Sequence, residues 1–152
     1  MSKSAYNFKH TIRVRWKECD VQGIAYFGSY LDFMDVAQVE YFRNLGILTH
    51  DPSQRKEFDL SSVKVTLEYK SPAKIDEKID VYFKVKNIGN SSITKIAEIY
   101  RADSDVLLTT GEMISVNFDP ELGKSKRVPD KIRSVIEILR IASKTSLIDL
   151  NH

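Results

Sequence analysis

One segment with helical character constrains the fold more than any other part of the chain. Ser29, followed by Asp32, predicts a capping box at its start, and Gly46 predicts its C-terminal stop. A helix over residues 30–45 would be about 24 Å long. Its apolar residues exceed the single stripe of a surface helix, so we expect other structure to surround it. They are Tyr30, Leu31, Phe33, Met34, Val36, Ala37, Val39, Tyr41, Phe42 and Leu45.

Alternating apolar and polar residues predict strands on both sides of this helix in the sequence. Gly111 predicts a bulge or a bend in the last strand, and short turns between the later strands predict an antiparallel meander. The helical spacing of Ile132 and its apolar neighbours predicts a short final helix, followed by a loose tail from about Ala142 to His152. The expected strands cover residues 10–16, 63–69, 79–85, 93–100 and 106–118.

This order predicts an α+β fold in which a five-stranded antiparallel sheet curls around the long helix. The chain has no repeat, low-complexity tract or Pro/Gly/Ser-rich linker, so residues 1–152 are expected to form a single domain with a core over about 8–140. A curled sheet leaves edge strands that favour pairing with another subunit. We therefore expect an oligomer.

Composition excludes several classes of protein. A net charge of +2 with interspersed signs argues against a nucleic-acid binder. The one cysteine, Cys19, excludes an intramolecular disulfide, and no histidine pair has metal-ligand spacing. No apolar run approaches the roughly 20 residues of a membrane span. Residues 1–9 lack the apolar core of a signal peptide. We expect a cytoplasmic protein with no metal and no cofactor.

Carboxylates are the remaining candidates for chemistry. Asp20 lies in a polar loop ending at Gly23, between the first strand and the long helix. This placement sets an acid near the unpaired N–H groups of a helix start, which suits attack on a carbonyl. From spacing alone, a loop aspartate is more often a turn former or a cap. Cys19 is interpreted as a small packed residue rather than a nucleophile.

Residues 16–31, WKECDVQGIAYFGSYL, resemble the signature of hotdog-fold acyl-CoA thioesterases of the 4-hydroxybenzoyl-CoA thioesterase family. Asp20, Gly23, Tyr26 and Tyr30 stand at the positions of the family pattern. Further family elements recur as Tyr69-Lys70-Ser71-Pro72-Ala73, Gly89-Asn90-Ser91-Ser92-Ile93 and Val128-Pro129, so the resemblance covers residues 8–140.

The resemblance implies a hotdog fold, assembled as a homodimer or homotetramer, that hydrolyses a small or medium acyl-CoA to the free acid and CoA. It implies that Asp20 acts as nucleophile or general base. Backbone N–H groups of Phe27 and Gly28 would polarise the thioester carbonyl. Asp35, on the long helix, is the reserve acid. The implied substrate-binding residues are Gly23, Tyr26, Tyr30, Lys70 and Ser71.

The sequence departs from the family pattern at two positions, because many relatives have histidine where this chain has Phe27 and threonine where it has Cys19. Three alternatives accompany the hydrolase prediction. A hotdog hydratase is disfavoured because the fifth residue after Asp20 is Ala25 and not histidine. A thioesterase acting on acyl-carrier protein and a non-catalytic acyl-ligand module both stay open. Basic residues near the last strand, Lys124, Lys126 and Arg127, are a further candidate group for phosphate contacts.

Overall fold

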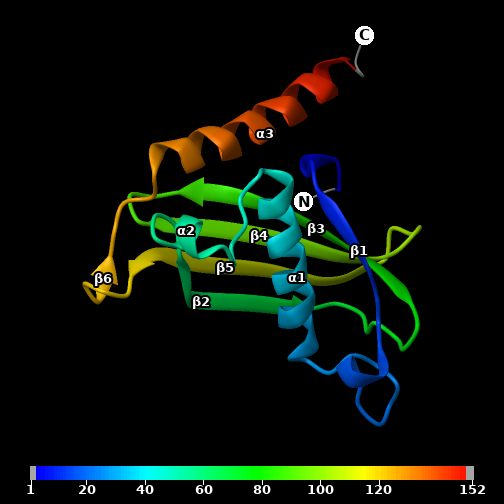
Figure 1. The fold of residues 1–152 in the computed structure, drawn as a ribbon. Helices are drawn as coiled ribbons and strands as arrows, with labels where there is room; N and C mark the ends of the chain where they lie inside the picture. Colours follow the sequence, from blue (N-terminus) through cyan, green and yellow to red (C-terminus); the bar gives the residue numbers. More distant parts are fainter. Residues whose placement is uncertain (1–2, 150–152) are drawn as a thin grey trace.

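The computed structural model describes residues 3–149, with side chains described through residue 141. Figure 1 shows a long helix lying across one face of a single antiparallel sheet, with a second long helix along one side of that sheet. The helices are α1 (Ser29–Asn44), α2 (Pro52–Arg55) and α3 (Asp130–Asp149). The strands are β1 (Lys9–Arg13), β2 (Leu60–Tyr69), β3 (Lys78–Ile88), β4 (Ser92–Arg101), β5 (Leu107–Asp119) and β6 (Lys124–Ser125).

The strand order is β1-β3-β4-β5-β2, and the short β6 pairs with the end of β5. Strands β3, β4 and β5 form the predicted meander, but the prediction is wrong at β2, which pairs with β5 instead of β3. The chain makes no hairpin after β2. Its next segment instead bridges to the loop before α1, where Lys74 pairs with Ile24. This connection carries the chain from the β2 edge of the sheet to the position beside β1, where β3 begins.

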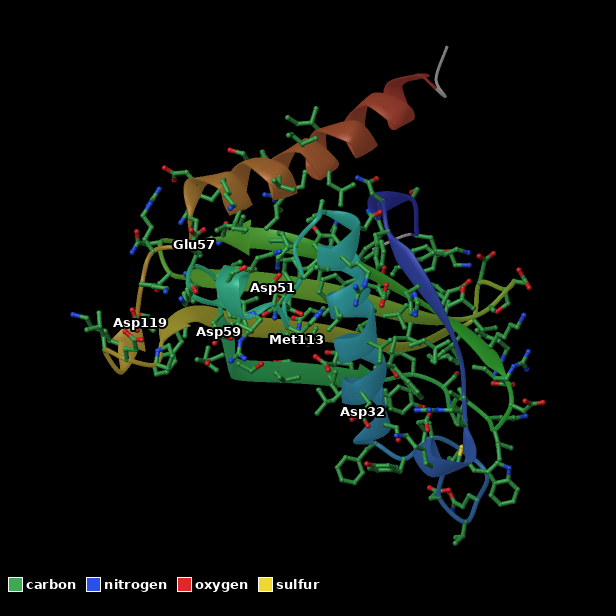
Figure 2. The ribbon with its side chains drawn as sticks, in the orientation of Figure 1. Asp32, Asp51, Glu57, Asp59, Met113 and Asp119 are labelled. Atoms are coloured by element: carbon green, nitrogen blue, oxygen red, sulfur yellow. The ribbon has the colours of Figure 1, made fainter. Side chains whose placement is uncertain are left out.

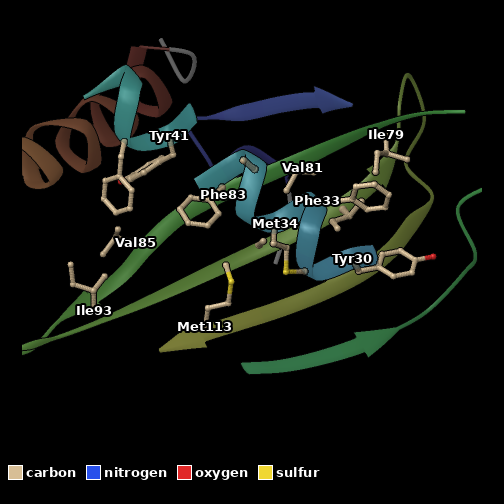
Figure 3. Close-up of a cluster of buried hydrophobic side chains, with 14 of the residues drawn as sticks. Tyr30, Phe33, Met34, Tyr41, Ile79, Val81, Phe83, Val85, Ile93 and Met113 are labelled. Atoms are coloured by element: carbon tan, nitrogen blue, oxygen red, sulfur yellow. The ribbon is translucent and has the colours of Figure 1, made fainter. Parts of the chain in front are cut away.

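The concave face of the sheet packs against α1, as the broad apolar surface of the helix predicted (Figure 3). Phe33, Met34, Ala37 and Phe42 of α1 are all at most 2% exposed. Burial of this kind contributes about 1.5–3 kcal/mol for each large apolar side chain. The expected architecture of a sheet curled around a long helix is confirmed. The strand residues on the helix side include Ile79, Val81, Phe83, Val85, Ile93 and Met113.

The two ends of α1 differ in how well the sequence predicted them. Gly46 follows the helix with a φ of +79°, the left-handed conformation expected of a glycine stop. At the other end the predicted Ser29 cap is wrong, because Gly28 is the N-cap and no side chain caps the helix. The Ser29 hydroxyl instead donates to the carbonyl of Glu18, at 2.7 Å. Competition from this buried bond removes Ser29 from the capping role.

The first strand is shorter than predicted. It ends at Arg13, and Trp16 begins a 3-10 turn with its side chain 86% exposed. Val14 still bonds to the segment before β3, through its N–H to the carbonyl of Glu77 at 2.9 Å, and the chain then enters the 3-10 turn at Trp16. The predicted half-buried strand through Trp16 is therefore wrong in its last residues.

Gly111 neither bulges nor bends the last long strand. It holds a regular position between Ala97 and Leu67, and the pairing irregularities lie elsewhere in the sheet. A Cβ atom at Gly111 would lie 2.6 Å from Sδ of Met34 and 3.0 Å from Cδ2 of Leu67. The glycine is required because α1 approaches the sheet closely at this point.

The C-terminal helix α3 extends well beyond the apolar spacing that predicted it. It is helical through Asp149, where a loose tail was expected from about Ala142, and residues 150–152 lie outside the described part. Within residues 3–149, no helix is both long and apolar enough to cross a membrane.

Candidate active site

Asp20 lies in a tight turn that backbone hydrogen bonds hold in place. Its N–H donates to the carbonyl of Ile24 at 3.0 Å, and Gly23 reverses the chain direction with a φ of +75°. Oδ1 of Asp20 accepts the N–H of Gln22 at 2.8 Å. The turn therefore fixes one carboxylate oxygen, as an aspartate in such a loop commonly does. The carboxylate stays exposed to solvent.

The start of α1 lies beside this turn and is held by the carbonyl of Glu18. That carbonyl accepts the N–H of Tyr26 at 3.0 Å as well as the Ser29 hydroxyl. The N–H of Ser29 in turn bonds to the carbonyl of Tyr26 at 2.9 Å. Between these anchors, the N–H groups of Phe27 and Gly28 have no acceptor among residues 3–149. They form part of the positive end of the helix dipole.

The end of β2 and the segment after it form a third side of this region, next to the Asp20 turn and the start of α1. The hydroxyl of Tyr69 donates to the carbonyl of Phe27 at 2.8 Å. The hydroxyl of Tyr30 accepts the N–H of Ala73 at 3.1 Å. These two bonds join the helix start to the family element that begins at Tyr69. Lys70 pairs with Glu68 at 3.1 Å on the same strand end.

A cavity of about 360 Å³ opens where the three walls meet. Several predicted site residues line it together, although they come from a loop, a helix start and a strand end. Gly23 and Gly28 belong to the walls without lining the cavity. Asp35 lies further along α1, exposed, and receives a weak bond from Gln38 at 3.5 Å. The lining residues are Asp20, Ile24, Ala25, Tyr26, Phe27, Tyr30, Tyr69, Lys70, Ser71 and Pro72.

Two residues of this region were missed in assigning roles from the sequence. The sequence indicates Tyr69 only as part of a family element at the end of an alternating strand, and nothing in that alternation indicates a bond to α1. Glu18 is 3% exposed and pairs through Oε1 with Nε of Arg15 at 2.9 Å. Its carbonyl organises the helix start, a role that no side-chain pattern could reveal.

Burial shapes the titration of two groups near the cavity. It raises the pKa of the Cys19 thiol, and the carboxylates of Glu18 and Asp20 raise it further. This keeps the thiol protonated and agrees with its interpretation as a packed residue. Burial also raises the pKa of Tyr30, against the lowering effect of the Ala73 N–H. Across the described residues 3–149, no three His, Cys, Asp or Glu side chains cluster closely enough to hold a metal ion.

The other carboxylates do not line the cavity. Figure 2 shows Asp32 at the start of α1, near the cavity but outside its lining, whereas Asp59 and Asp119 lie around α2 and β6 at the far end of the sheet. Asp59 pairs with Arg55 at 3.1 Å, and Asp119 lies 4.0 Å from Lys126. Among the residues that line the cavity, Asp20 is the one that carries a carboxylate.

The family model of the thioesterase-like superfamily matches residues 14–136, which span the Asp20 turn, α1 and strands β2 to β5. The chain belongs to this superfamily. The family resemblance predicted from the motif around Asp20 is confirmed.

Individual relatives agree with this assignment. The chain is 26% identical over 129 residues to the acyl-CoA thioester hydrolase YbgC of Escherichia coli O6:H1, covering 82% of this chain and 92% of YbgC. Slr0204 of Synechocystis, a 1,4-dihydroxy-2-naphthoyl-CoA thioesterase, has a similar fold, with a TM-score of 0.78, 19% identity and coverage of 85% and 94%. SAV2348 of Staphylococcus aureus, solved in complex with CoA, gives a TM-score of 0.78 at 14% identity, with coverage of 88% and 83%.

Proposed function

We propose that this protein is an acyl-CoA thioesterase that releases a small or medium free acid and CoA. The observation that carries the proposal is the cavity that brings Asp20 to the start of α1, where the N–H groups of Phe27 and Gly28 have no acceptor in the described chain. The acyl-CoA thioester hydrolase YbgC, related over most of the chain, supports the choice of substrate class.

Asp20 supplies the reactive carboxylate. As a nucleophile, its free oxygen attacks the thioester carbonyl, the C–S bond breaks to release the CoA thiolate, and water then cleaves the resulting anhydride. As a general base, it takes a proton from a water that attacks the same carbonyl, and the C–S bond then breaks to release the CoA thiolate. Gln22 orients the carboxylate in either route, because its N–H holds Oδ1 and leaves Oδ2 for the reaction.

The backbone N–H groups of Phe27 and Gly28 supply the electrophilic assistance. Negative charge develops on the carbonyl oxygen in either route, and two fixed N–H donors at a helix start stabilise that charge without reorganising. The Phe27 side chain is 76% exposed, so its role is limited to shape while its peptide carries the contact. This arrangement works with phenylalanine where many relatives have histidine.

Binding of the acyl-CoA falls to residues around the same cavity. Tyr26, Tyr30, Lys70 and Ser71 all line the cavity. In the proposed complex the two aromatic rings flank the acyl thioester, and Lys70 and Ser71 receive the pantetheine arm. Gly23 allows the tight turn that exposes the Asp20 carboxylate. SAV2348, a structural neighbour solved with CoA, makes a CoA-carrying substrate the natural first choice.

We propose an oligomer as the working form. The edge strand β2 points apolar side chains toward the α1 side of the sheet, and in one chain Val63 and Val65 stay 60% and 41% exposed. Leu31 on the neighbouring face of α1 is 39% exposed. A second copy would cover this surface and satisfy the free edge of β2. Light scattering on the purified protein at micromolar concentration tests this, and a monomer would contradict it.

A panel of substrates tests the proposed function. Acetyl-, hexanoyl-, decanoyl- and benzoyl-CoA are compared with the same acyl groups on acyl-carrier protein, and the release of free thiol is the readout. Turnover of at least one acyl-CoA by the wild type, with loss in Asp20→Asn, is the expected result. Preference for the carrier-protein substrates would favour the alternative thioesterase. Binding without turnover of any thioester would favour a non-catalytic acyl-ligand module.

A further inference from the structure

Tyr69 makes a long-range contact with the start of α1. It is the last residue of β2, and its hydroxyl donates to the carbonyl oxygen of Phe27 at 2.8 Å. Its ring packs edge-to-face on Tyr30, with 5.4 Å between ring centroids and an interplanar angle of 74°. The ring contact holds the hydroxyl at the carbonyl, although the Tyr69 side chain is about half exposed.

The acceptor of this bond shares a peptide unit with one of the proposed oxyanion donors. The carbonyl of Phe27 and the N–H of Gly28 belong to the same planar peptide, and that peptide is trans. In a trans peptide the C=O and N–H bonds point in opposite directions. A bond that fixes the carbonyl of Phe27 therefore also fixes the direction of the Gly28 N–H.

Few other contacts reach this peptide. The N–H groups of Tyr26 and Ser29 are hydrogen-bonded on either side of it, but neither of these bonds is made by an atom of the Phe27–Gly28 peptide itself. The helix has no side-chain cap at Gly28. The ring of Tyr26 lies against Cα of Gly28, close enough that a Cβ would come within 2.7 Å of Cε2. This contact closes one side of the peptide without bonding to it.

We propose that Tyr69 is a positioning residue for the thioesterase reaction, holding the Phe27–Gly28 peptide so that the Gly28 N–H faces the thioester oxygen. The inference rests on the proposed function. The hydrogen bond to the carbonyl also polarises the peptide, because hydrogen bonds on opposite ends of one amide strengthen each other. Tyr69 thereby acts on the transition state through Gly28, without itself contacting the reacting atoms.

The direct test is Tyr69→Phe, which deletes the hydroxyl and keeps the ring that packs on Tyr30. We expect kcat for the best acyl-CoA of the panel to fall about tenfold or more, with KM changed less than about threefold, because the lost contact acts at the transition state. Tyr82→Phe, on the opposite face of the sheet, is the matched control and should keep wild-type kinetics. A rise in KM with kcat unchanged would make Tyr69 a substrate contact and overturn the proposal.

A double substitution separates positioning from other roles. Gly28→Pro removes the N–H that Tyr69 is proposed to aim, so adding Tyr69→Phe to Gly28→Pro should lower kcat no further. If Tyr69→Phe lowered kcat by the same factor in the wild type and in Gly28→Pro, Tyr69 would act independently of this peptide, which would overturn the proposal.

The amide resonance of Gly28 gives a readout that needs no substrate. Its proton and nitrogen shifts should move in Tyr69→Phe and stay in place in Tyr82→Phe. Full kcat in Tyr69→Phe, or an unmoved Gly28 amide, would overturn the positioning role while leaving the thioesterase proposal intact. A wild type that hydrolyses no thioester would overturn both, even with a shifted amide.

Discussion

The hydroxyl of Tyr30, in the first turn of α1, accepts the backbone N–H of Ala73 at 3.1 Å, and Ala73 is fully buried. This bond ties the helix start to the connection between β2 and β3. It thereby sets the distance between the Asp20 turn and the cavity wall formed by residues 69–72.

Tyr30→Phe should therefore destabilise the fold. The substitution leaves the buried N–H of Ala73 without its acceptor, which costs about 1–3 kcal/mol in the free energy of unfolding. Urea unfolding followed by circular dichroism measures the loss. Tyr26→Phe removes a hydroxyl from a half-exposed ring and should stay within about 0.5 kcal/mol of wild type. Equal stabilities for the two variants would show that the Ala73 bond contributes nothing.

Gly111→Ala should destabilise the protein through contact with α1. The added Cβ would meet the Met34 side chain and Leu67 at distances that force one of them to move. Overpacking of this kind costs about 1–3 kcal/mol. Met34→Ala empties the space that the added Cβ would enter. The free energy of unfolding of the double variant Met34→Ala/Gly111→Ala should therefore fall by much less than the sum of the decreases in the two single variants. Strict additivity would contradict the proposed close approach.

Lys95 should make stability depend on pH in an unusual direction. It is buried under α1, where Nζ donates to Oγ of Ser115 at 2.8 Å and to Oε1 of Gln38. Burial lowers its pKa from 10.5 to about 8, although Asp35 opposes the shift. The unfolded chain therefore binds more protons than the folded one between pH 8 and 10.5, so this lysine makes the fold more stable as pH rises through that window.

Comparison with Lys95→Met isolates this effect, since other titrating groups are common to both proteins. Between about pH 8 and 10, the unfolding free energy of the wild type should gain about 2 kcal/mol relative to the variant. Parallel pH profiles for the two proteins would show that Lys95 titrates normally in the folded state.

Gly28→Pro should lower kcat by about 10²–10³-fold, the effect of losing one oxyanion donor. The φ of Gly28 is −74°, which proline adopts, so the fold should survive. Gly28→Ala is the matched control because it adds the Cβ that meets the Tyr26 ring but keeps the N–H. Phe27→Leu should cost less than about tenfold, since its peptide is retained. A Gly28→Pro variant as active as Gly28→Ala would remove this N–H from the mechanism.

The sequence predicted features that depend on local chemistry and missed those set by distant contacts. The apolar surface of α1 and the stop at Gly46 follow from residue type and spacing, whereas the grouping of Asp20 with Tyr26 and Tyr30 was predicted from the family resemblance. The pairing of β2 with β5 depends on the path of the connection between β2 and β3, and the alternation of apolar and polar residues carries no information about that path. The capping of α1 was mispredicted because Ser29 finds a buried carbonyl eleven residues earlier.

Asp20→Asn measured beside Asp35→Asn tests the central claim most directly. The amide keeps the shape of each side chain and removes its nucleophilicity and basicity. With the best acyl-CoA of the panel, kcat should fall by several orders of magnitude in Asp20→Asn and stay near wild type in Asp35→Asn, while both variants keep the wild-type circular dichroism spectrum. Full turnover by Asp20→Asn, with loss in Asp35→Asn, would contradict the account and move the chemistry to the middle of α1.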